Sequence, residues 1–155
     1  MTSTEDFRPS LERVVVVGAS LAGLRAAETL RQHAAVGSVV VVGDEPHRPY
    51  DRPPLSKKLL SGEWEPERIH LRQPDSFDDL DVEWRLGNAA RSLDLSARTV
   101  TLAGGESIPF DSLIIATGAR PRRLPGHDTF DHVHELRSLD DALALRAEIA
   151  PGGRR

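Results

Sequence analysis

Two valine-rich runs, RVVVVG at 13–18 and VVVV at 39–42, constrain the fold of this chain more than any other feature. Both runs are short and β-branched, which is typical of buried strands in a parallel sheet. Between them, residues 19–35 carry apolar side chains at helical spacing and charged side chains on other faces, which predicts an amphipathic helix. We expect Gly37 to end this helix. The three elements predict a right-handed βαβ unit.

The remainder of the chain predicts further strands and short helices, with a weaker pattern. The expected elements are, in order, a short extended piece at 69–73, a short helix at 74–80, a half-buried strand at 82–87, a β-hairpin over 98–110, a buried strand at 112–118 and a helix over 138–150. A capping box at Ser138 and Asp141 should begin the last helix, and the run 151–153 should halt it. We therefore expect an α/β, Rossmann-like fold in three layers, with a parallel sheet and a small antiparallel hairpin layer.

The composition excludes several classes of protein. The net charge of −4 argues against a nucleic-acid partner. The chain has no cysteine, so it carries no disulfide framework, thiolate metal site or dithiol relay. No apolar run reaches the roughly 18 residues needed to span a membrane, and the N-terminal sequence MTSTEDFRPSLER is too polar for a signal peptide. We therefore expect a cytoplasmic protein with no membrane partner.

A metal site has weak support in the sequence. Apart from His132 and His134, the six histidines are scattered, and on a strand these two would share one face. Two ligands without a third are poor evidence for a metal site. We therefore interpret the histidines as surface or packing residues and expect no bound metal.

The first predicted strand leads into a glycine turn, GASLAG, at 18–23. Gly18 allows a tight strand-to-helix turn, and Gly23 lets the helix pack closely on the strand. The start of the helix then offers backbone N–H groups and a positive dipole end to a pyrophosphate. Ser20 stands at the usual middle-glycine position, where its side chain is small and its hydroxyl could donate to a phosphate oxygen. Taken alone, such a turn can also be a plain strand-to-helix connection.

The second predicted strand ends in two acidic residues, Asp44 and Glu45. They follow Gly23 by about twenty residues, where an acidic side chain accepts hydrogen bonds from the ribose hydroxyls of an adenosine. Strand, glycine turn, helix, strand and acidic end together predict a dinucleotide-binding unit. An acidic residue at this position also favours a nucleotide whose ribose carries no phosphate.

A proline-rich loop, GDEPHRPYDRPPLSKKLLSG, follows the second strand. Pro49, Pro53 and Pro54 fix their own φ angles and disfavour helix for the residues before them. The loop would therefore present Arg52 and Lys57 from a preset frame. Because an NAD-binding domain would continue with an ordinary helix, we interpret this frame as suited to FAD, whose flavin half extends beyond its adenosine.

Three stretches, VVVVGASLAGLRAAETLR, GDEPHRPYDRPPLSKKLLSG and FDSLIIATGARPRRLP, resemble the FAD-dependent reductases of ferredoxin and rubredoxin, which are pyridine nucleotide flavoproteins of the putidaredoxin reductase type. The resemblance covers residues 12–150, and RPPLSK is its most specific block. It implies a protein with an FAD domain split in sequence, an inserted NAD domain and a C-terminal domain. This chain resembles the first FAD-domain segment, after a flexible leader at 1–11 and before a linker at 151–155 to an NAD-binding domain.

The resemblance implies which residues of this chain bind FAD. The glycine turn would contact the pyrophosphate. Asp44 and Glu45 would contact the adenosine ribose, and the backbone of Ala90 the adenine. Arg137 and the end of the strand at 112–118 would lie beside the cofactor. The full implied set is Gly18, Ser20, Leu21, Ala22, Gly23, Asp44, Glu45, Arg52, Lys57, Ala90, Ala116, Thr117, Gly118 and Arg137.

The resemblance also implies the chemistry. Lys57 would be the catalytic residue, with its ammonium against the reactive edge of the flavin. NADH or NADPH, bound by a domain not present here, would deliver hydride. The flavin would then release single electrons to a ferredoxin- or rubredoxin-type iron–sulfur protein that feeds an oxygenase. Two other interpretations stay open: a flavin-binding module for signalling or interaction without enzyme activity, and a plain NAD-binding domain.

Overall fold

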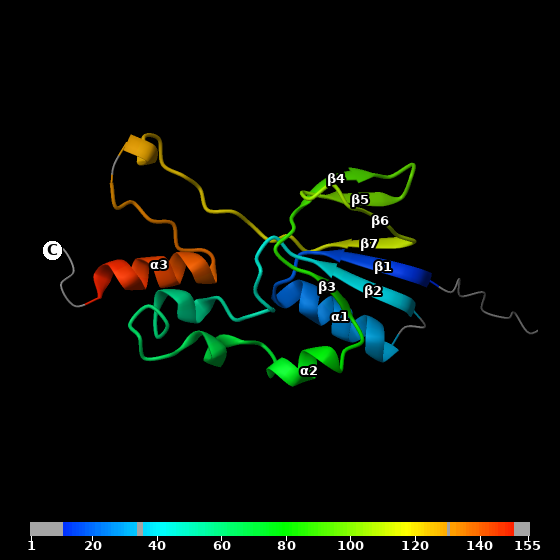
Figure 1. Cartoon of the computed structure of the whole chain (residues 1–155), viewed down its shortest axis with the longest axis horizontal. Helices are drawn as coiled ribbons and strands as arrows, with labels where there is room; N and C mark the ends of the chain where they lie inside the picture. The colour runs from blue at the N-terminus through cyan, green and yellow to red at the C-terminus, as the bar shows by residue number, and fades with distance from the viewer. Residues whose placement is uncertain (1–10, 34–35, 130, 151–155) are drawn as a thin grey trace, which may run out of the picture.

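The computed structural model describes residues 11–33, 36–129 and 131–150 and has three layers, a helix, a parallel sheet and an antiparallel sheet (Figure 1). The strands are β1 (Leu11–Val17), β2 (Val36–Val42), β3 (Glu83–Arg85), β4 (Ala90–Asp94), β5 (Thr99–Leu102), β6 (Ser107–Pro109) and β7 (Ser112–Ile115). The α-helices are α1 (Leu21–His33), α2 (Pro74–Asp78) and α3 (Leu139–Ile149). The four-stranded sheet has the order β3-β2-β1-β7 and the three-stranded sheet the order β4-β5-β6. This is the predicted α/β class.

The first three elements form the predicted βαβ unit. β1 and β2 pair in parallel, with Val16 opposite Val41. Both valines belong to a buried cluster that includes Ala27 of α1. The apolar stripe of α1 therefore covers one face of the parallel sheet, because burying that stripe stabilises both elements.

Gly37 does not end α1, so this prediction is wrong. α1 ends at His33 and β2 begins at Val36, which places Gly37 inside the strand. A Cβ atom at position 37 would lie 2.6 Å from the carbonyl oxygen of Glu12 in β1. The glycine therefore permits a close approach between two strands, a requirement that local sequence does not reveal.

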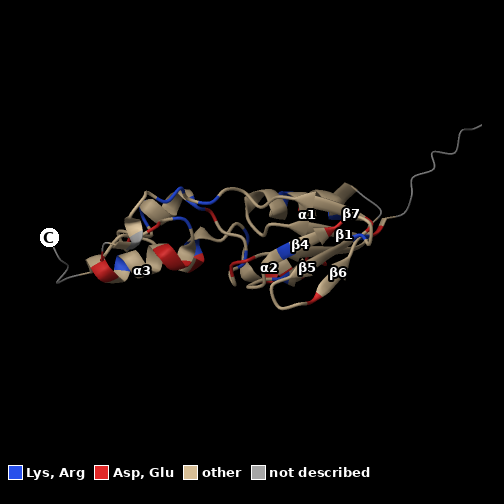
Figure 2. Ribbon diagram, turned by 90° about the horizontal axis from the view of Figure 1, so that it is seen from above, with Lys and Arg blue, Asp and Glu red and all other residues tan. Residues whose placement is uncertain are grey.

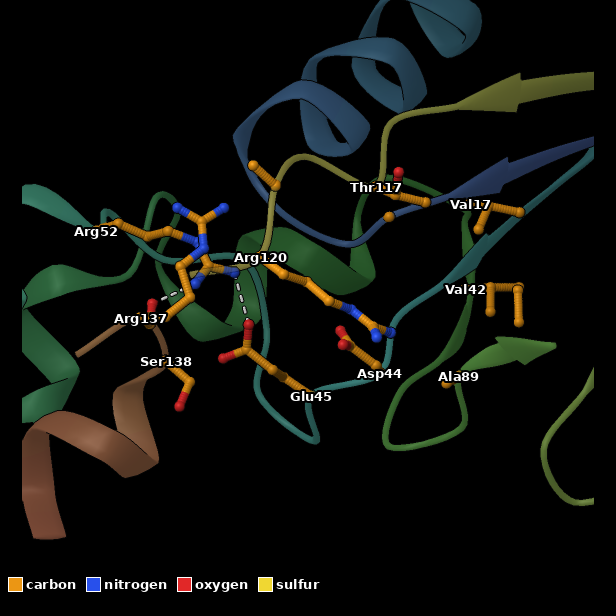
Figure 3. A pocket seen from close by; sticks show the side chains of 13 residues that line it. Val17, Val42, Asp44, Glu45, Arg52, Ala89, Thr117, Arg120, Arg137 and Ser138 are labelled. Atoms are coloured by element: carbon orange, nitrogen blue, oxygen red, sulfur yellow. Dashed lines mark hydrogen bonds and ion pairs between the residues drawn. The ribbon is translucent and has the colours of Figure 1, made fainter. Parts of the chain in front are cut away.

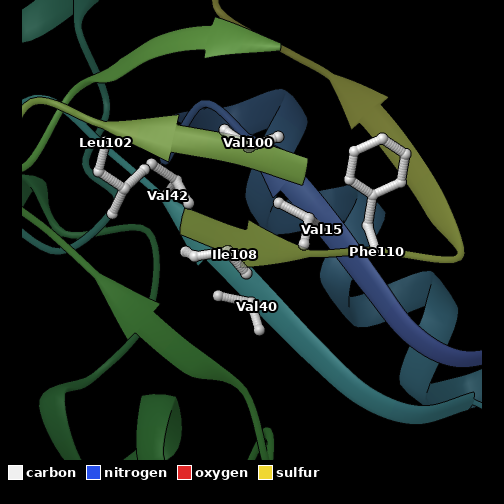
Figure 4. Close-up of a cluster of buried hydrophobic side chains, with 7 residues drawn as sticks. All are labelled: Val15, Val40, Val42, Val100, Leu102, Ile108 and Phe110. Atoms are coloured by element: carbon white, nitrogen blue, oxygen red, sulfur yellow. The ribbon is translucent and has the colours of Figure 1, made fainter. Parts of the chain in front are cut away.

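The other face of the parallel sheet packs against the antiparallel sheet (Figure 4). Val15, Val40 and Val42 project from β1 and β2 into this interface. The antiparallel layer contributes Val100, Leu102, Ile108 and Phe110. β5 and β6 are the predicted hairpin, and β4 adds a strand that the sequence did not predict. Most residues of β4 are exposed, so no apolar alternation marks it.

The segment that leads to β3, the outer strand of the parallel sheet next to β2, matches the prediction in part. α2 and β3 lie within the predicted ranges 74–80 and 82–87. The piece predicted as extended at 69–73 is present in part. The backbones of His70 and Gln73 are extended and His70 forms an isolated bridge with Tyr50, but Ile69 ends a 3-10 turn over Pro66–Ile69. Proline fixes the φ angle at the start of this turn, which the apolar pattern alone did not capture.

The last helix, α3, has the predicted start. Ser138 accepts a hydrogen bond from the backbone of Asp141, and the Asp141 side chain accepts one from the backbone of Ser138, which completes the capping box. The residues predicted to halt this helix, 151–153, lie outside the described residues. None of the helices in the described part of the chain has the length and apolar character needed to cross a membrane.

Two strands of the parallel sheet differ from the prediction at their ends. β1 begins at Leu11, the last residue of the predicted leader, and residues 1–10 lie outside the described part. β7 ends at Ile115, which is 66% exposed, so the strand is half-buried rather than buried. β7 stands at the end of the strand order, where one side has no neighbouring strand among the described residues.

The proline-rich loop and α3 form a separate apolar cluster, at the end of the molecule away from the sheets (Figures 1 and 2). A 3-10 turn over Pro53–Ser56 begins with two prolines. It brings Leu55 and Leu59 into contact with a buried group that includes Leu139 of α3. The prolines therefore support a packed structural element whose partner lies far along the chain.

We predict that Leu59→Ala destabilises this lobe strongly. Leu59 is 0% exposed, and removing a buried leucine side chain costs about 2–5 kcal/mol. Leu95→Ala is the matched control, because Leu95 is 74% exposed and surface changes stay within about 0.5 kcal/mol. Urea unfolding of both variants measures the difference. Equal free energies of unfolding would show that the loop does not depend on this cluster.

Candidate functional site

A cavity of about 220 Å³ opens where β1, β2 and β7 end (Figure 3). Val17 and Val42, the last residues of β1 and β2, line the cavity, and Thr117 lines it just after β7. In open parallel sheets, ligands bind outside the carboxyl ends of the strands. The fold therefore places a cavity where a ligand of such a sheet is expected.

Close backbone contacts hold the glycine turn beside this cavity. Gly18 has a φ of 121°, and its N–H donates to the carbonyl oxygen of Val42 over 2.8 Å. A Cβ atom on Gly18 would lie 2.1 Å from the carbonyl oxygen of Ala116. A Cβ atom on Gly23 would lie 1.7 Å from the carbonyl oxygen of Gly18. Both positions therefore require glycine.

The remaining residues of the turn lie at the start of α1. Ser20 lines a smaller hollow of about 30 Å³ together with Gly18 and Ala116. α1 begins directly after Ser20, so its first N–H groups lie beside this hollow. Leu21 and Ala22 are exposed and are not among the residues that line either hollow. The structure thus brings only part of the predicted set to the cavity wall.

The two acidic residues after β2 have different surroundings. Glu45 is held on both carboxylate oxygens, because Arg52 Nη2 donates to Oε1 over 2.6 Å and the Tyr50 hydroxyl donates to Oε2. Asp44 is exposed and lines the cavity, and its side chain has no hydrogen-bond or ion-pair partner within the described residues. Asp44 is therefore the carboxylate that is available to a ligand.

Tyr50 is a residue of this region that sequence reasoning missed. It is 5% exposed, and its hydroxyl also accepts a hydrogen bond from the backbone N–H of Leu139 over 2.9 Å. Burial, together with the hydrogen bond to Glu45, raises the pKa of Tyr50 well above its ordinary value, so the hydroxyl stays protonated and donates. Tyr50 is the single tyrosine of the chain and lies among the loop prolines, which could have drawn attention to it.

Arg52 connects the loop after β2 to the segment before α3. Besides its ion pair with Glu45, its guanidinium donates to the backbone carbonyl of Arg137. Arg137 lines the cavity, and a Cβ atom on Gly118 would lie 3.3 Å from its Nη2 atom. Ala90, at the start of β4, lines the same cavity. Residues that are distant from one another in the sequence therefore meet at one cavity.

A further arginine, Arg120, lines the cavity and was not predicted as a site residue. Figure 3 shows its side chain extended toward Asp44. Arg120 belongs to the run ARPRRLP, where the sequence offers no signal that distinguishes it from the neighbouring Arg122 and Arg123. Arg120 lines the cavity because of the path that the chain takes after β7.

Lys57 lies away from this cavity. It is exposed, its Nζ donates to the carbonyl oxygen of Pro53 over 3.2 Å, and it is not among the residues that line the cavity. The neighbouring Lys58 pairs with Glu63 over 2.9 Å. The catalytic role that the resemblance implies for Lys57 stays a prediction.

The cavity combines groups that recognise phosphate with a group that recognises hydroxyls. Arg52, Arg120 and Arg137 supply positive charge, and guanidinium groups bind phosphate well. The start of α1 supplies backbone N–H groups and the positive end of the helix dipole. Asp44 can accept hydrogen bonds from sugar hydroxyls. This arrangement can hold a nucleotide.

Comparison with known proteins identifies the family. Residues 12–155 match the family model described as pyridine nucleotide-disulphide oxidoreductase. The chain belongs to this family. Although the family name refers to a disulphide, the chain contains no cysteine.

Several relatives are ferredoxin reductases. The chain is 39% identical over 145 residues to the probable ferredoxin reductase CtmF of Castellaniella defragrans, which covers 92% of this chain and 35% of the relative. It is 36% identical over 143 residues to the ferredoxin–NAD(+) reductase component of the p-cumate 2,3-dioxygenase system of Pseudomonas putida, with coverages of 92% and 35%. The crystal structure of the covalent putidaredoxin reductase–putidaredoxin complex matches with a TM-score of 0.81 and 33% identity, over 90% of this chain and 34% of that one. The chain thus spans about a third of the length of the relatives it matches.

We predict that Gly18→Ala disrupts the turn more than Gly105→Ala. Both glycines have positive φ angles, but a Cβ atom on Gly105 would meet nothing within 4 Å. Gly105→Ala should therefore lower the free energy of unfolding only by the roughly 1–2 kcal/mol that a left-handed backbone costs a residue with a Cβ atom. Gly18→Ala should lower it by roughly a further 1–3 kcal/mol, because the added methyl group overpacks the turn. Urea unfolding of the two variants compares these costs. Equal losses would show that the contact with Ala116 relaxes freely.

Proposed function

We propose that this chain is the FAD-binding part of an NAD(P)H-dependent reductase that passes electrons to a ferredoxin- or rubredoxin-type iron–sulfur protein. The observation that carries the proposal is the cavity, where the glycine turn, the start of α1 and the carboxylate of Asp44 meet at the ends of parallel strands. Relatives that are named as ferredoxin reductases, one of them part of a dioxygenase system, support the choice of partner and a link to an oxygenase.

The described residues fit the adenosine diphosphate half of FAD. Gly18 and Gly23 place no side chain at the two ends of the turn, and Arg52 has a buried Nε atom without a hydrogen-bond partner in the described part of the chain. The cavity of about 220 Å³ is smaller than the roughly 300–1,000 Å³ of common ligand pockets. We therefore infer that it takes a part of FAD and that residues beyond this sequence complete the site.

The chain's own residues bind and orient the cofactor in this proposal. N–H groups at the start of α1 donate to the pyrophosphate oxygens, and Arg52 and Arg137 offset the phosphate charge. Asp44 accepts hydrogen bonds from the ribose hydroxyls, while Glu45 and Tyr50 hold the Arg52 guanidinium in place. FAD, when bound, supplies the exchange between two-electron and one-electron chemistry.

The other half of the reaction belongs to residues outside this sequence. Because the chain matches about a third of its relatives' length, we assign the binding of NADH or NADPH to a further domain. Location in the cytoplasm is part of the same proposal.

The absorbance spectrum of the purified complete reductase tests the proposal. We expect visible flavin bands that bleach when NADH is added and reduction of a ferredoxin supplied as acceptor. A flavin-containing protein that reduces no iron–sulfur acceptor would instead support a signalling module. A colourless protein that binds NADH would support a plain NAD-binding domain.

Asp44→Ala should weaken FAD binding in the complete reductase, because it removes the acceptor for the ribose hydroxyls. A hydrogen bond to a charged group contributes about 1.5–3 kcal/mol, which is roughly ten- to a hundredfold in affinity. Fluorescence titration of the apoprotein measures the Kd, with Asp79→Ala at the exposed end of α2 as the control. The assignment of Asp44 to the ribose fails if Asp44→Ala retains the wild-type Kd.

Lys57→Met should slow hydride transfer from NADH in the complete reductase and keep most of the FAD binding, because the adenosine half of the site is untouched. The support is the resemblance of RPPLSK to the reductase family, which implies a fixed cation near developing negative charge. Loss of one such preorganised group slows chemistry by about ten- to a thousandfold. Stopped-flow absorbance after mixing with NADH measures the rate.

Lys58→Met is the matched control for this experiment. Lys58 pairs with Glu63 on the surface, so its replacement should leave the rate unchanged. Equal rates for wild type and Lys57→Met would assign Lys57 to the solvated loop, where it now contacts Pro53.

A further inference from the structure

The segment between β7 and α3 brings two histidines against the last turns of α3 (Figure 1). His132 Nδ1 lies 2.5 Å from Glu148 Oε1, and His134 Nε2 contacts Glu148 Oε2. The three ligand atoms lie within 4.8 Å of one another. Sequence reasoning found two possible metal ligands and no third, and the third comes from a helix that follows later in the chain.

The backbone at His132 contributes to this arrangement. His132 has a φ of 64°, which lies in the left-handed region that residues other than glycine rarely adopt. The residues from His132 to His134 are therefore not a regular strand. Both imidazoles nevertheless contact the carboxylate of Glu148. A turn, and not the shared face of a strand, therefore brings the two histidines together.

The geometry and the ligand types suit a zinc-class ion. Zn²⁺ binds imidazole nitrogen and carboxylate oxygen at about 2.0–2.2 Å with tetrahedral angles, which sets neighbouring ligand atoms roughly 3.4 Å apart. The three ligand atoms, which lie within 4.8 Å of one another, already have a spacing close to that value. The side chains of His132, His134 and Glu148 are 49%, 30% and 40% exposed, so water reaches all three.

The surroundings leave room for the remaining ligands. His134 lines a hollow of about 340 Å³, where water can complete the coordination of an ion. Imidazole binds a metal ion through an unprotonated ring nitrogen, so an ion would replace the present contacts between the two histidines and Glu148.

We propose that His132, His134 and Glu148 bind one divalent transition-metal ion of the zinc class, with water in the remaining positions. Two imidazoles and one carboxylate form a donor set that zinc accepts and that magnesium, which prefers oxygen ligands, does not. The ion links the segment before α3 to the helix itself. This site is separate from the cavity at the strand ends and does not depend on the proposed reductase function.

Isothermal titration calorimetry of the tag-free chain with ZnCl₂ at pH 7.5 tests the proposal. We expect saturable binding of one ion per chain and no comparable heat with MgCl₂. Removing a side chain that only orients a metal ligand already lowers the metal affinity roughly 10–100-fold. His134→Ala and Glu148→Gln, which each remove a ligand, should therefore weaken Zn²⁺ binding by about a hundredfold or more.

His33→Ala is the matched control, because His33 is an exposed histidine at the end of α1 and should leave the affinity unchanged. Circular dichroism checks that the variants keep the fold, which we expect because all three ligands are exposed. Zn²⁺ should also raise the Tm of wild type and not that of Glu148→Gln. The proposal is overturned by absence of saturable Zn²⁺ binding, by equal affinity in the ligand variants, or by Mg²⁺ binding of similar strength.

Discussion

The close approach of the glycine turn to the two strands beside β1 is the constraint on which the site depends. Gly18 donates to Val42 at the end of β2, and there is no room for a Cβ atom between Gly18 and the carbonyl of Ala116 after β7. This one residue therefore sets the spacing of three strand ends. The same packing places Gly23 and the start of α1 against β1, so the cavity follows from backbone contact rather than from side-chain chemistry.

A half-buried polar network then connects the cavity to α3. Glu45, Arg52 and Tyr50 hydrogen-bond with one another and with the backbone of Arg137 and Leu139. These hydrogen bonds link the loop after β2 to the start of α3 and hold the loop in one arrangement. Both acidic residues line the cavity, but the carboxylate of Glu45 is hydrogen-bonded to Arg52 and Tyr50, whereas that of Asp44 has no such partner within the described residues.

α3 is held along its length by contacts with segments that are distant in sequence. Its N-terminus has the capping box and the Tyr50 hydrogen bond, and Arg146 near its end pairs with Glu65 over 2.9 Å. The histidine cluster around Glu148 adds a third attachment. The proline-rich loop packs beneath the same helix. The loop that the sequence predicted as a frame for Arg52 and Lys57 thus also contributes to the apolar core of a small lobe.

Local sequence determined the βαβ unit, the hairpin and the start of α3, because apolar periodicity, glycine spacing and capping act between near neighbours. It also determined that an acid follows β2 at the distance a nucleotide requires. Tertiary structure decided the role of Gly37, the pairing of the exposed strand β4, and the choice of Asp44 over Glu45. It alone joined Glu148 to the two histidines. These features depend on contacts between distant segments, which no local pattern encodes.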